Sequence, residues 1–470
     1  MIRRKIQSAL VAARSDNVSL KTLLIRATGG VFVLRIIAQG LGLVTGVMLA
    51  RLLGSVQYGA YTYAFSWLNV LTIPALLGMN TLVTREIATY RARQDWPKLW
   101  GMLRFASALT LTLALILAGG VLVVSALILT ASQPDVILPF TQGFDRTLTQ
   151  PVDLMPVYTL WIALLLLPFN AVTTVRAAAM RGLQRVVQGY MPDLLLRPLL
   201  FIALFGGIYM LLDGQVSAPV AMLARLLTGI IVFGYGLFIL LRALNQTVER
   251  ARPAYEFRSW LRSALPMLGV GLVNVAQQRL DVLMLGPLRG LEEVAYYSVA
   301  LTLSGLAVML LDAVNQSLAP AIASLYATGD TGKLQRLLTR SVRLAVLGTL
   351  PIVLLLVLFG EIILSIYGPT FRSAYPSLLI LIVGQLVNSM AGSVGNVLIM
   401  GGQERIVLAG RVAGTVLYFV LNLLLIPTWG MIGAAVATTL SLITWNAILA
   451  WFAWRRLGLA TTIFGNQKLW

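Results

Sequence analysis

Apolar segments of about twenty residues alternate with short polar connections along the whole chain. A bilayer core about 30 Å thick needs about 20 apolar residues of helix, and in lipid only helices or closed barrels satisfy the backbone. A run such as 109–129 is too long and too uniform for a barrel strand. The pattern therefore predicts an all-α polytopic membrane protein of about twelve transmembrane helices. The predicted spans are 28–50, 58–81, 104–130, 156–178, 190–212, 216–241, 264–286, 293–320, 343–367, 374–400, 406–426 and 431–454.

The basic residues lie mainly on alternate connections. The terminal segments and connections on one side of the membrane together carry 28 Lys and Arg. The connections on the other side carry only four, which are Arg51, Arg146, Arg289 and Arg372. Cytoplasmic loops carry such an excess, so both termini are expected in the cytoplasm. The first 27 residues lack a small-residue cleavage site and are interpreted as a basic interfacial lead-in rather than a removable signal peptide.

The two halves of the chain are related in sequence. An offset of 235 residues places Asn80 on Asn315, Asp95 on Asp330 and Lys98 on Lys333 without a gap. Each half has an even number of spans, so the pattern predicts two six-helix bundles related by a pseudo-twofold axis along the membrane normal, with a substrate path between them. The expected division is a lead-in (1–27), an N-terminal bundle (28–241), a cytoplasmic linker (242–263), a C-terminal bundle (264–454) and a cytoplasmic tail (455–470).

Composition excludes several classes of function. The formal charge of +19 would suggest nucleic acid in a soluble protein, but here the cations follow the positive-inside rule. The chain has no Cys and no His, so protein-ligated zinc, haem and disulfides are not expected. Hydrolase and nucleotide-binding motifs are absent from the sequence. The longest outer loop, 131–155, with Asp135, Asp145 and Asp153, is short for a membrane polymerase.

Charges inside the apolar spans are the candidate site. A charge at the bilayer centre costs about 2.5–3.5 kcal/mol on insertion scales, so such residues tend to face a wet cavity or each other. The predicted cationic cavity residues are Arg35, Arg197, Arg225 and Arg279. The alternative for Arg35, Arg197 and Arg279, which stand nearer to span ends, is a structural charge that snorkels to the membrane surface. Because guanidinium groups grip phosphate oxygens in a bidentate fork, they favour an anionic substrate with a pyrophosphate head group.

Two acids and several amides complete the set of candidates. Asp281 and Asp312 either form salt bridges with arginines of other spans, which we favour, or take up a coupling proton or Na⁺. No other cofactor and no resident metal are expected. The neutral groups that could contact sugar hydroxyls, or hydrogen-bond between helices instead, are Gln39, Asn274, Gln277, Gln278, Asn315 and Asn388.

Several segments resemble the Wzx-type polysaccharide flippases of the multidrug/oligosaccharidyl-lipid/polysaccharide exporter (MOP) superfamily. The similar stretches are LARLLGSVQYGAY (49–61), TREIATYRAR (84–93), LDVLMLG (280–286) with AYYS (295–298), IYGPTF (366–371) and IPTWGMIGAA (426–435). The likeness extends from about residue 25 to about residue 455, in the family's order and spacing.

The resemblance implies a transporter rather than an enzyme. It would translocate an undecaprenyl-diphosphate-linked oligosaccharide across the bacterial cytoplasmic membrane by alternating access, for surface polysaccharide such as lipopolysaccharide. Its partners would be membrane lipids, that substrate and other polysaccharide assembly proteins. Two alternatives stay open: a cation-coupled drug exporter of the same superfamily, and a membrane polysaccharide polymerase or ligase.

Overall fold

The computed structural model describes residues 2–132, 154–327 and 330–463, which are helical almost throughout and contain no strand. The first half comprises α1 (Ile2–Leu76), α2 (Met79–Ala92), α3 (Trp96–Ser132), α4 (Met155–Gly182), α5 (Val186–Met191), the π-helix η2 (Pro192–Leu196), α6 (Arg197–Leu211) and α7 (Ala218–Thr247). The second half comprises α8 (Phe257–Arg289), α9 (Leu291–Leu306), α10 (Met309–Ala327), α11 (Thr331–Tyr367), the 3₁₀ turn η3 (Pro369–Ala374), α12 (Tyr375–Ala391), α13 (Val394–Met400) and α14 (Glu404–Leu457). The predicted all-α class is confirmed. The acids of the predicted outer loop, Asp135, Asp145 and Asp153, lie outside the described residues.

Among the described residues, eight helical segments are long and apolar enough to cross a membrane. Two of these, in α1 and α14, fold back at a glycine with non-helical backbone: Gly54 (φ 77°, ψ 173°) and Gly430 (φ 57°, ψ −133°). A Cβ built on Gly46 would lie 3.7 Å from the Tyr58 hydroxyl, whereas residues twelve apart on a straight helix are about 18 Å apart. With α8 and the more polar α9–α10 pair, these hairpins give the twelve passes that the sequence predicted.

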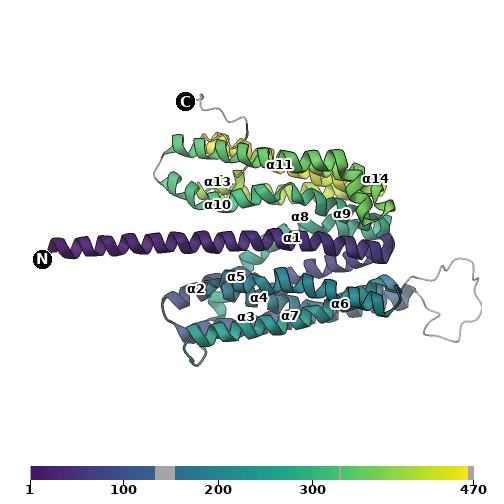
Figure 1. Cartoon of the computed structure of the whole chain (residues 1–470), viewed down its shortest axis with the longest axis horizontal. Helices are drawn as coiled ribbons and strands as arrows, with labels where there is room; N and C mark the ends of the chain where they lie inside the picture. The colour runs from purple at the N-terminus through teal and green to yellow at the C-terminus, as the bar shows by residue number, and fades with distance from the viewer. Residues whose placement is uncertain (1, 133–153, 328–329, 464–470) are drawn as a thin grey trace, which may run out of the picture.

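The two halves form two groups of roughly parallel helices. Figure 1 shows α2 to α7 in one group and α10 to α14 in the other, with α1, α8 and α9 between them. The long helix α1 packs against α4 of its own half and against α8 and α9 of the other. The start of α1 and the end of α14 lie toward the same end of the molecule (Figure 1). The protein is therefore a multi-pass membrane protein, and the cytoplasmic location of both termini stays a prediction.

The sequence repeat recurs as one local structure at the start of α3 and of α11. The backbone N–H of Lys98 donates to Asp95 Oδ1 (3.3 Å), and that of Lys333 donates to Asp330 Oδ1 (2.9 Å). In both pairs the ammonium lies by the other carboxylate oxygen, at 3.6 and 2.8 Å. The hydrogen bonds from Lys333 hold the pKa of Asp330 below its ordinary value. Each aspartate accepts a hydrogen bond from an otherwise unpaired N–H of the first helical turn. The matched aspartates therefore cap the corresponding helix in each half.

The halves are locked together at the end where α1 and α14 turn back. Arg51 donates to the last carbonyl groups of α11, at Ile366 (2.6 Å) and Ser365 (3.0 Å), where a cation is favourable. Ser55 donates to Glu292 at 3.1 Å, and the Tyr58 and Phe371 rings meet at 6.0 Å. These contacts join the α1 hairpin to the second half, so this end of the molecule is closed.

The turn in α14 depends on Gly430. Glu293 accepts a hydrogen bond from the Met431 backbone N–H at 2.7 Å, and a Cβ on Gly430 would lie 2.2 Å from the same carboxylate oxygen. The backbone there also lies in a region that side chains rarely adopt. Both the lack of room for a Cβ atom and the backbone conformation therefore require glycine at position 430.

We expect Gly430→Ala to lower the free energy of unfolding by about 1–3 kcal/mol, measured as a lower melting temperature of the detergent-solubilised protein. The control is Gly119→Ala in α3, where a Cβ would meet nothing within 4 Å and removal of a helical glycine should stabilise slightly. Equal melting temperatures for the two variants would contradict this role of Gly430.

Candidate functional site

A cavity of about 940 Å³ lies between α1 and η2 of the first half and α8, α9, α10, α12 and α14 of the second. We call it the large cavity. Among its lining residues are most of the predicted candidates: Arg35, Gln39, Gln277, Gln278, Arg279, Asp281 and Asp312. Arg35, Gln278 and Asp312 are exposed, so the cavity is open to its surroundings. Its position on α1, before the closed turn at Gly54, places it toward the end of the molecule where the chain begins.

A second cavity of about 340 Å³, the small cavity, adjoins the large one and shares Arg279 with it. Arg197 and Arg225 line it together with the aromatic residues Tyr58, Tyr61, Phe65 and Phe201. All four predicted arginines therefore line two adjoining cavities. Their spacing along the chain, in four different predicted spans, gave no indication of how close the fold brings them.

Arg225 is positioned by aromatic rings rather than by an acid. Its Nη1 donates to the Tyr61 hydroxyl at 2.8 Å, and its guanidinium carbon lies 4.0 Å from the centre of the Phe65 ring. Its Nε is buried and has no hydrogen-bond partner. Cation–π contact stabilises a desolvated guanidinium without neutralising it. The positive charge of Arg225 is thus still available to an anion.

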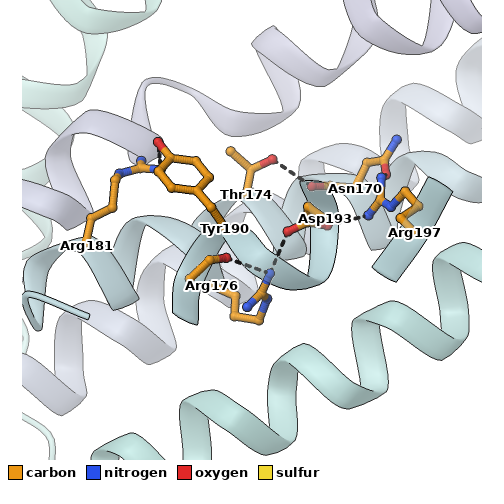
Figure 2. A network of polar contacts seen from close by, with 8 residues as sticks. Asn170, Thr174, Arg176, Arg181, Tyr190, Asp193 and Arg197 are labelled. Atoms are coloured by element: carbon orange, nitrogen blue, oxygen red, sulfur yellow. Dashed lines mark hydrogen bonds and ion pairs between the residues drawn. The ribbon is translucent and has the colours of Figure 1, made fainter. Parts of the chain in front are cut away.

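Arg197 belongs to a polar network that Figure 2 shows from close by. Its Nη2 lies 2.8 Å from Asp193 Oδ1, and its Nη1 donates to Asn170 at 3.1 Å. The other carboxylate oxygen of Asp193 lies 2.6 Å from Nη2 of Arg176, a residue that is 2% exposed. One carboxylate is thus shared by two guanidinium groups, and the network keeps a positive charge in excess.

The remaining arginines of the large cavity form no ion pair with a described acid. No described carboxylate lies within 4.0 Å of a nitrogen of Arg35, Arg279 or Arg411. Arg411 hydrogen-bonds Asn274 and lies 5.3 Å from the Trp445 ring centre. Together the two cavities are lined by five arginines and three aspartates.

Two assignments from the sequence need correction. The 28 basic residues counted on the cytoplasmic side included Arg176 and Arg411, which stand near the ends of the predicted spans 156–178 and 406–426. Arg176 is instead buried within α4, and Arg411 lines the large cavity from α14. The favoured salt bridge of Asp281 is not formed with any described residue. Instead, Asp281 is 1% exposed and accepts from the Tyr297 hydroxyl at 2.5 Å, while that hydroxyl also lies 3.0 Å from Thr438. Asp312 likewise has no described ion pair.

Three of the predicted amides lie outside the described cavity linings. Asn274 lies just behind the lining and orients Arg411. Asn388 accepts from Asn446 at 3.1 Å, and Asn315 accepts from Ser393. Both therefore hydrogen-bond between helices, the alternative that the sequence left open. The sequence reasoning missed the lining residues Asp193, Gln385, Arg411 and Trp445. A search for every acid within the span 190–212 would have found Asp193.

The comparisons with known proteins agree with this architecture. The family described as polysaccharide biosynthesis protein matches residues 24–326, well over half of the chain. The chain belongs to this family. The MatE family also matches, over residues 266–424. An inward-facing multidrug resistance MATE family transporter of the MOP superfamily has the same fold, with a TM-score of 0.65 at 14% identity over 91% of this chain and 98% of that one.

Two relatives come from Haloferax volcanii. The probable flippase AglR is 33% identical over 184 residues, which is 38% of this chain and 38% of that relative's length. The probable low-salt glycan biosynthesis flippase Agl15 is 22% identical over 421 residues, 89% of this chain and 81% of the relative. These relatives are flippases and not enzymes. The resemblance to Wzx-type flippases of the MOP superfamily is thereby confirmed.

The cavities are expected to attract anions, and single cysteines can measure this because the chain contains none. Thr302→Cys lies on the lining of both cavities. We expect it to react about tenfold faster with an anionic than with a cationic methanethiosulfonate, relative to a free thiol, because a cationic cleft concentrates anions. The control, Leu354→Cys, lies exposed on the outer surface of α11 and should react slowly with both reagents in the membrane. A preference of Thr302→Cys for the cationic reagent would contradict a cationic cavity.

Proposed function

We propose that the protein is a flippase that moves a polyprenyl-diphosphate-linked oligosaccharide across the cytoplasmic membrane for cell-surface polysaccharide biosynthesis. The observation that carries this proposal is the excess of guanidinium groups over carboxylates in two adjoining cavities between the halves. Uncompensated charge inside a membrane protein is costly. Four such arginines, Arg35, Arg225, Arg279 and Arg411, form no ion pair with a described acid, and an anion bound there would compensate their charge.

A diphosphate suits the small cavity. Its oxygens accept charge-assisted hydrogen bonds from several guanidinium groups at once, and Arg197, Arg225 and Arg279 all line this cavity. Buried Nε groups of Arg197 and Arg225 have no partner, and a donor without a partner is expensive to keep buried. Phosphate oxygens would supply the missing acceptors.

The glycan would occupy the large cavity. Its lining offers the amide groups of Gln39, Gln277, Gln278 and Gln385 and the indole of Trp445. Amides both donate and accept hydrogen bonds, as sugar hydroxyls require. The lipid tail would stay in the bilayer, since charged side chains line both cavities.

The contrast between a closed and an open end supports alternating access as the mechanism. The contacts of Arg51, Ser55 and Tyr58 with the second half close the end that we assign to the outside, and the large cavity lies toward the end that we assign to the cytoplasm. Opening the first and closing the second would carry the substrate across. Membrane lipids and other polysaccharide assembly proteins would be the partners, and the bacterial cytoplasmic membrane the location.

A cation-coupled drug exporter is the second candidate, because the MatE family matches residues 266–424. A drug cation would need surplus negative charge in the cavity. Five lining arginines against three aspartates favour an anion instead.

We expect Arg225→Gln and Arg279→Gln to slow leaflet exchange of a diphosphate-linked oligosaccharide in proteoliposomes by about 10- to 100-fold, the loss of one charged hydrogen bond. Arg336→Gln, an exposed position near the start of α11, is the matched control and should exchange normally. If the wild type transported a cationic dye and did not exchange the diphosphate-linked oligosaccharide, the drug exporter would be favoured. Normal exchange by both cavity variants would remove these arginines as substrate ligands.

Asp281 is our candidate for the coupling site of a proton or Na⁺. It is a buried carboxylate on the cavity lining that accepts from the Tyr297 hydroxyl, which in turn lies 3.0 Å from the hydroxyl of Thr438. Carboxylate and hydroxyl oxygens suit a hard cation or a proton.

In proteoliposomes, Asp281→Asn should abolish the acceleration of exchange by an imposed proton or Na⁺ gradient and keep the exchange seen without a gradient. Applying each gradient separately identifies the ion. A variant that still responds to the gradient as the wild type does would exclude Asp281 from coupling.

A further inference from the structure

We propose that Asp193 is an internal counter-anion that competes with the substrate's diphosphate for Arg197 and so limits how tightly the site holds its cargo. The inference rests on the proposed function and adds to it a device for release. It assigns a role to a carboxylate that lies inside an otherwise cationic pocket.

The geometry separates a permanent partner of Asp193 from an exchangeable one (Figure 2). Asp193 and Arg197 line the small cavity and keep 22% and 18% of their side-chain surface exposed. Arg176 is 2% exposed and is not among the described lining residues. A substrate in the cavity can therefore reach Arg197 and Asp193, whereas it cannot reach Arg176.

Arg176 is fixed behind the cavity wall. A Cβ on Gly236 of α7 would lie 2.6 Å from its Nε, so the helix packs directly on the guanidinium. Its Nη2 is 2.6 Å from Asp193 Oδ2 and 3.4 Å from the Gly189 carbonyl oxygen. Arg176 therefore compensates the charge of Asp193 whether or not Arg197 is engaged elsewhere, and Asp193 can stay bound to Arg176 while Arg197 turns from it to the substrate.

Asp193 bonds only one of the two N–H groups on one edge of the Arg197 guanidinium. The Nε and Nη2 groups share one edge of a guanidinium, and phosphate grips such an edge through two parallel bonds. Asp193 accepts from Nη2 alone, and Nε is buried without a partner. Nη1 is engaged separately by Asn170. A diphosphate that displaced the carboxylate would thus gain two bonds from Arg197 where the empty site has one.

This arrangement lowers the affinity for the substrate and also stabilises Arg197 in the empty site. The diphosphate must displace the Asp193 carboxylate from Arg197. The free energy of the lost Asp193–Arg197 bond therefore reduces the net free energy of substrate binding. When the cargo leaves, Arg197 returns to Asp193 instead of being left buried and charged. Without this competition, Arg197 would add its full set of hydrogen bonds to those of Arg225 and Arg279, the other arginines of the small cavity, and would slow release.

A merely structural Asp193 would have the opposite effect when removed. If the carboxylate only orients Arg197 toward the substrate, its loss should weaken binding. If it competes with the substrate, its loss should tighten binding and slow release. The sign of the change in affinity therefore decides between the two roles.

The test uses the full chain in detergent with a short-chain polyprenyl diphosphate as probe. Asp193→Asn alone would leave Arg176 buried without its partner, which is strongly destabilising. The decisive variant is therefore the double substitution R176Q/D193N, which removes both charges of the pair. A second version, R176M/D193L, replaces the pair with apolar groups and serves if the first is unstable.

We expect the double variant to bind the diphosphate about tenfold more tightly than the wild type and to exchange lipid-linked oligosaccharide more slowly. Arg197→Gln should weaken binding, and in that background the double substitution should no longer tighten it, because the competed group is gone. The corresponding monophosphate should show a smaller gain.

An unchanged or weaker affinity in a folded double variant, or a gain that persists without Arg197, would overturn the inference. Failure of the proposed function looks different: the wild type itself would then neither bind the probe nor exchange the lipid-linked glycan. Size-exclusion profiles and melting temperatures establish that each variant is folded.

Discussion

The cost of placing charge inside a bilayer governs this structure. Each guanidinium group there must be compensated, solvated or surrounded by polarisable groups. The protein uses all three solutions: Asp193 for Arg176 and Arg197, the open large cavity for Arg35 and Arg279, and aromatic rings for Arg225. Only the first neutralises charge. The net effect is a hollow between the halves whose lining carries more arginines than aspartates.

The fold supplies this hollow by joining the two halves at one end. The Gly54 turn allows α1 to return on itself and to bring Arg51, Ser55 and Tyr58 against the second half. The capped starts of α3 and α11, at Asp95 and Asp330, show that both halves are built on one plan. Because the halves are joined at the turn and cavities lie between them beside α1, charged residues of both halves line one connected region.

Much of this could be predicted from the sequence. Length and hydropathy of a span are local properties, so the helices and the four exceptional arginines were found. The partners of those arginines depend on which helices pack together. Asp193 was overlooked because it stands near the start of a predicted span, and a π-helix turns it toward Arg176 and Arg197. Arg411 and Arg176 lie close to span ends, where sequence alone cannot distinguish an interfacial cation from a buried one.

The distribution of the cavity arginines between the halves has a mechanical consequence. Arg197 and Arg225 belong to the first half, whereas Arg279 and Arg411 belong to the second, and Arg279 lines both cavities. Like charges on opposite walls repel in the empty protein, and no described acid forms an ion pair with Arg225, Arg279 or Arg411. An anion between the walls attracts both. A bound diphosphate would thus lower the energy of bringing the halves together around it, and the same charges that select the cargo would also couple its binding to the movement that carries it.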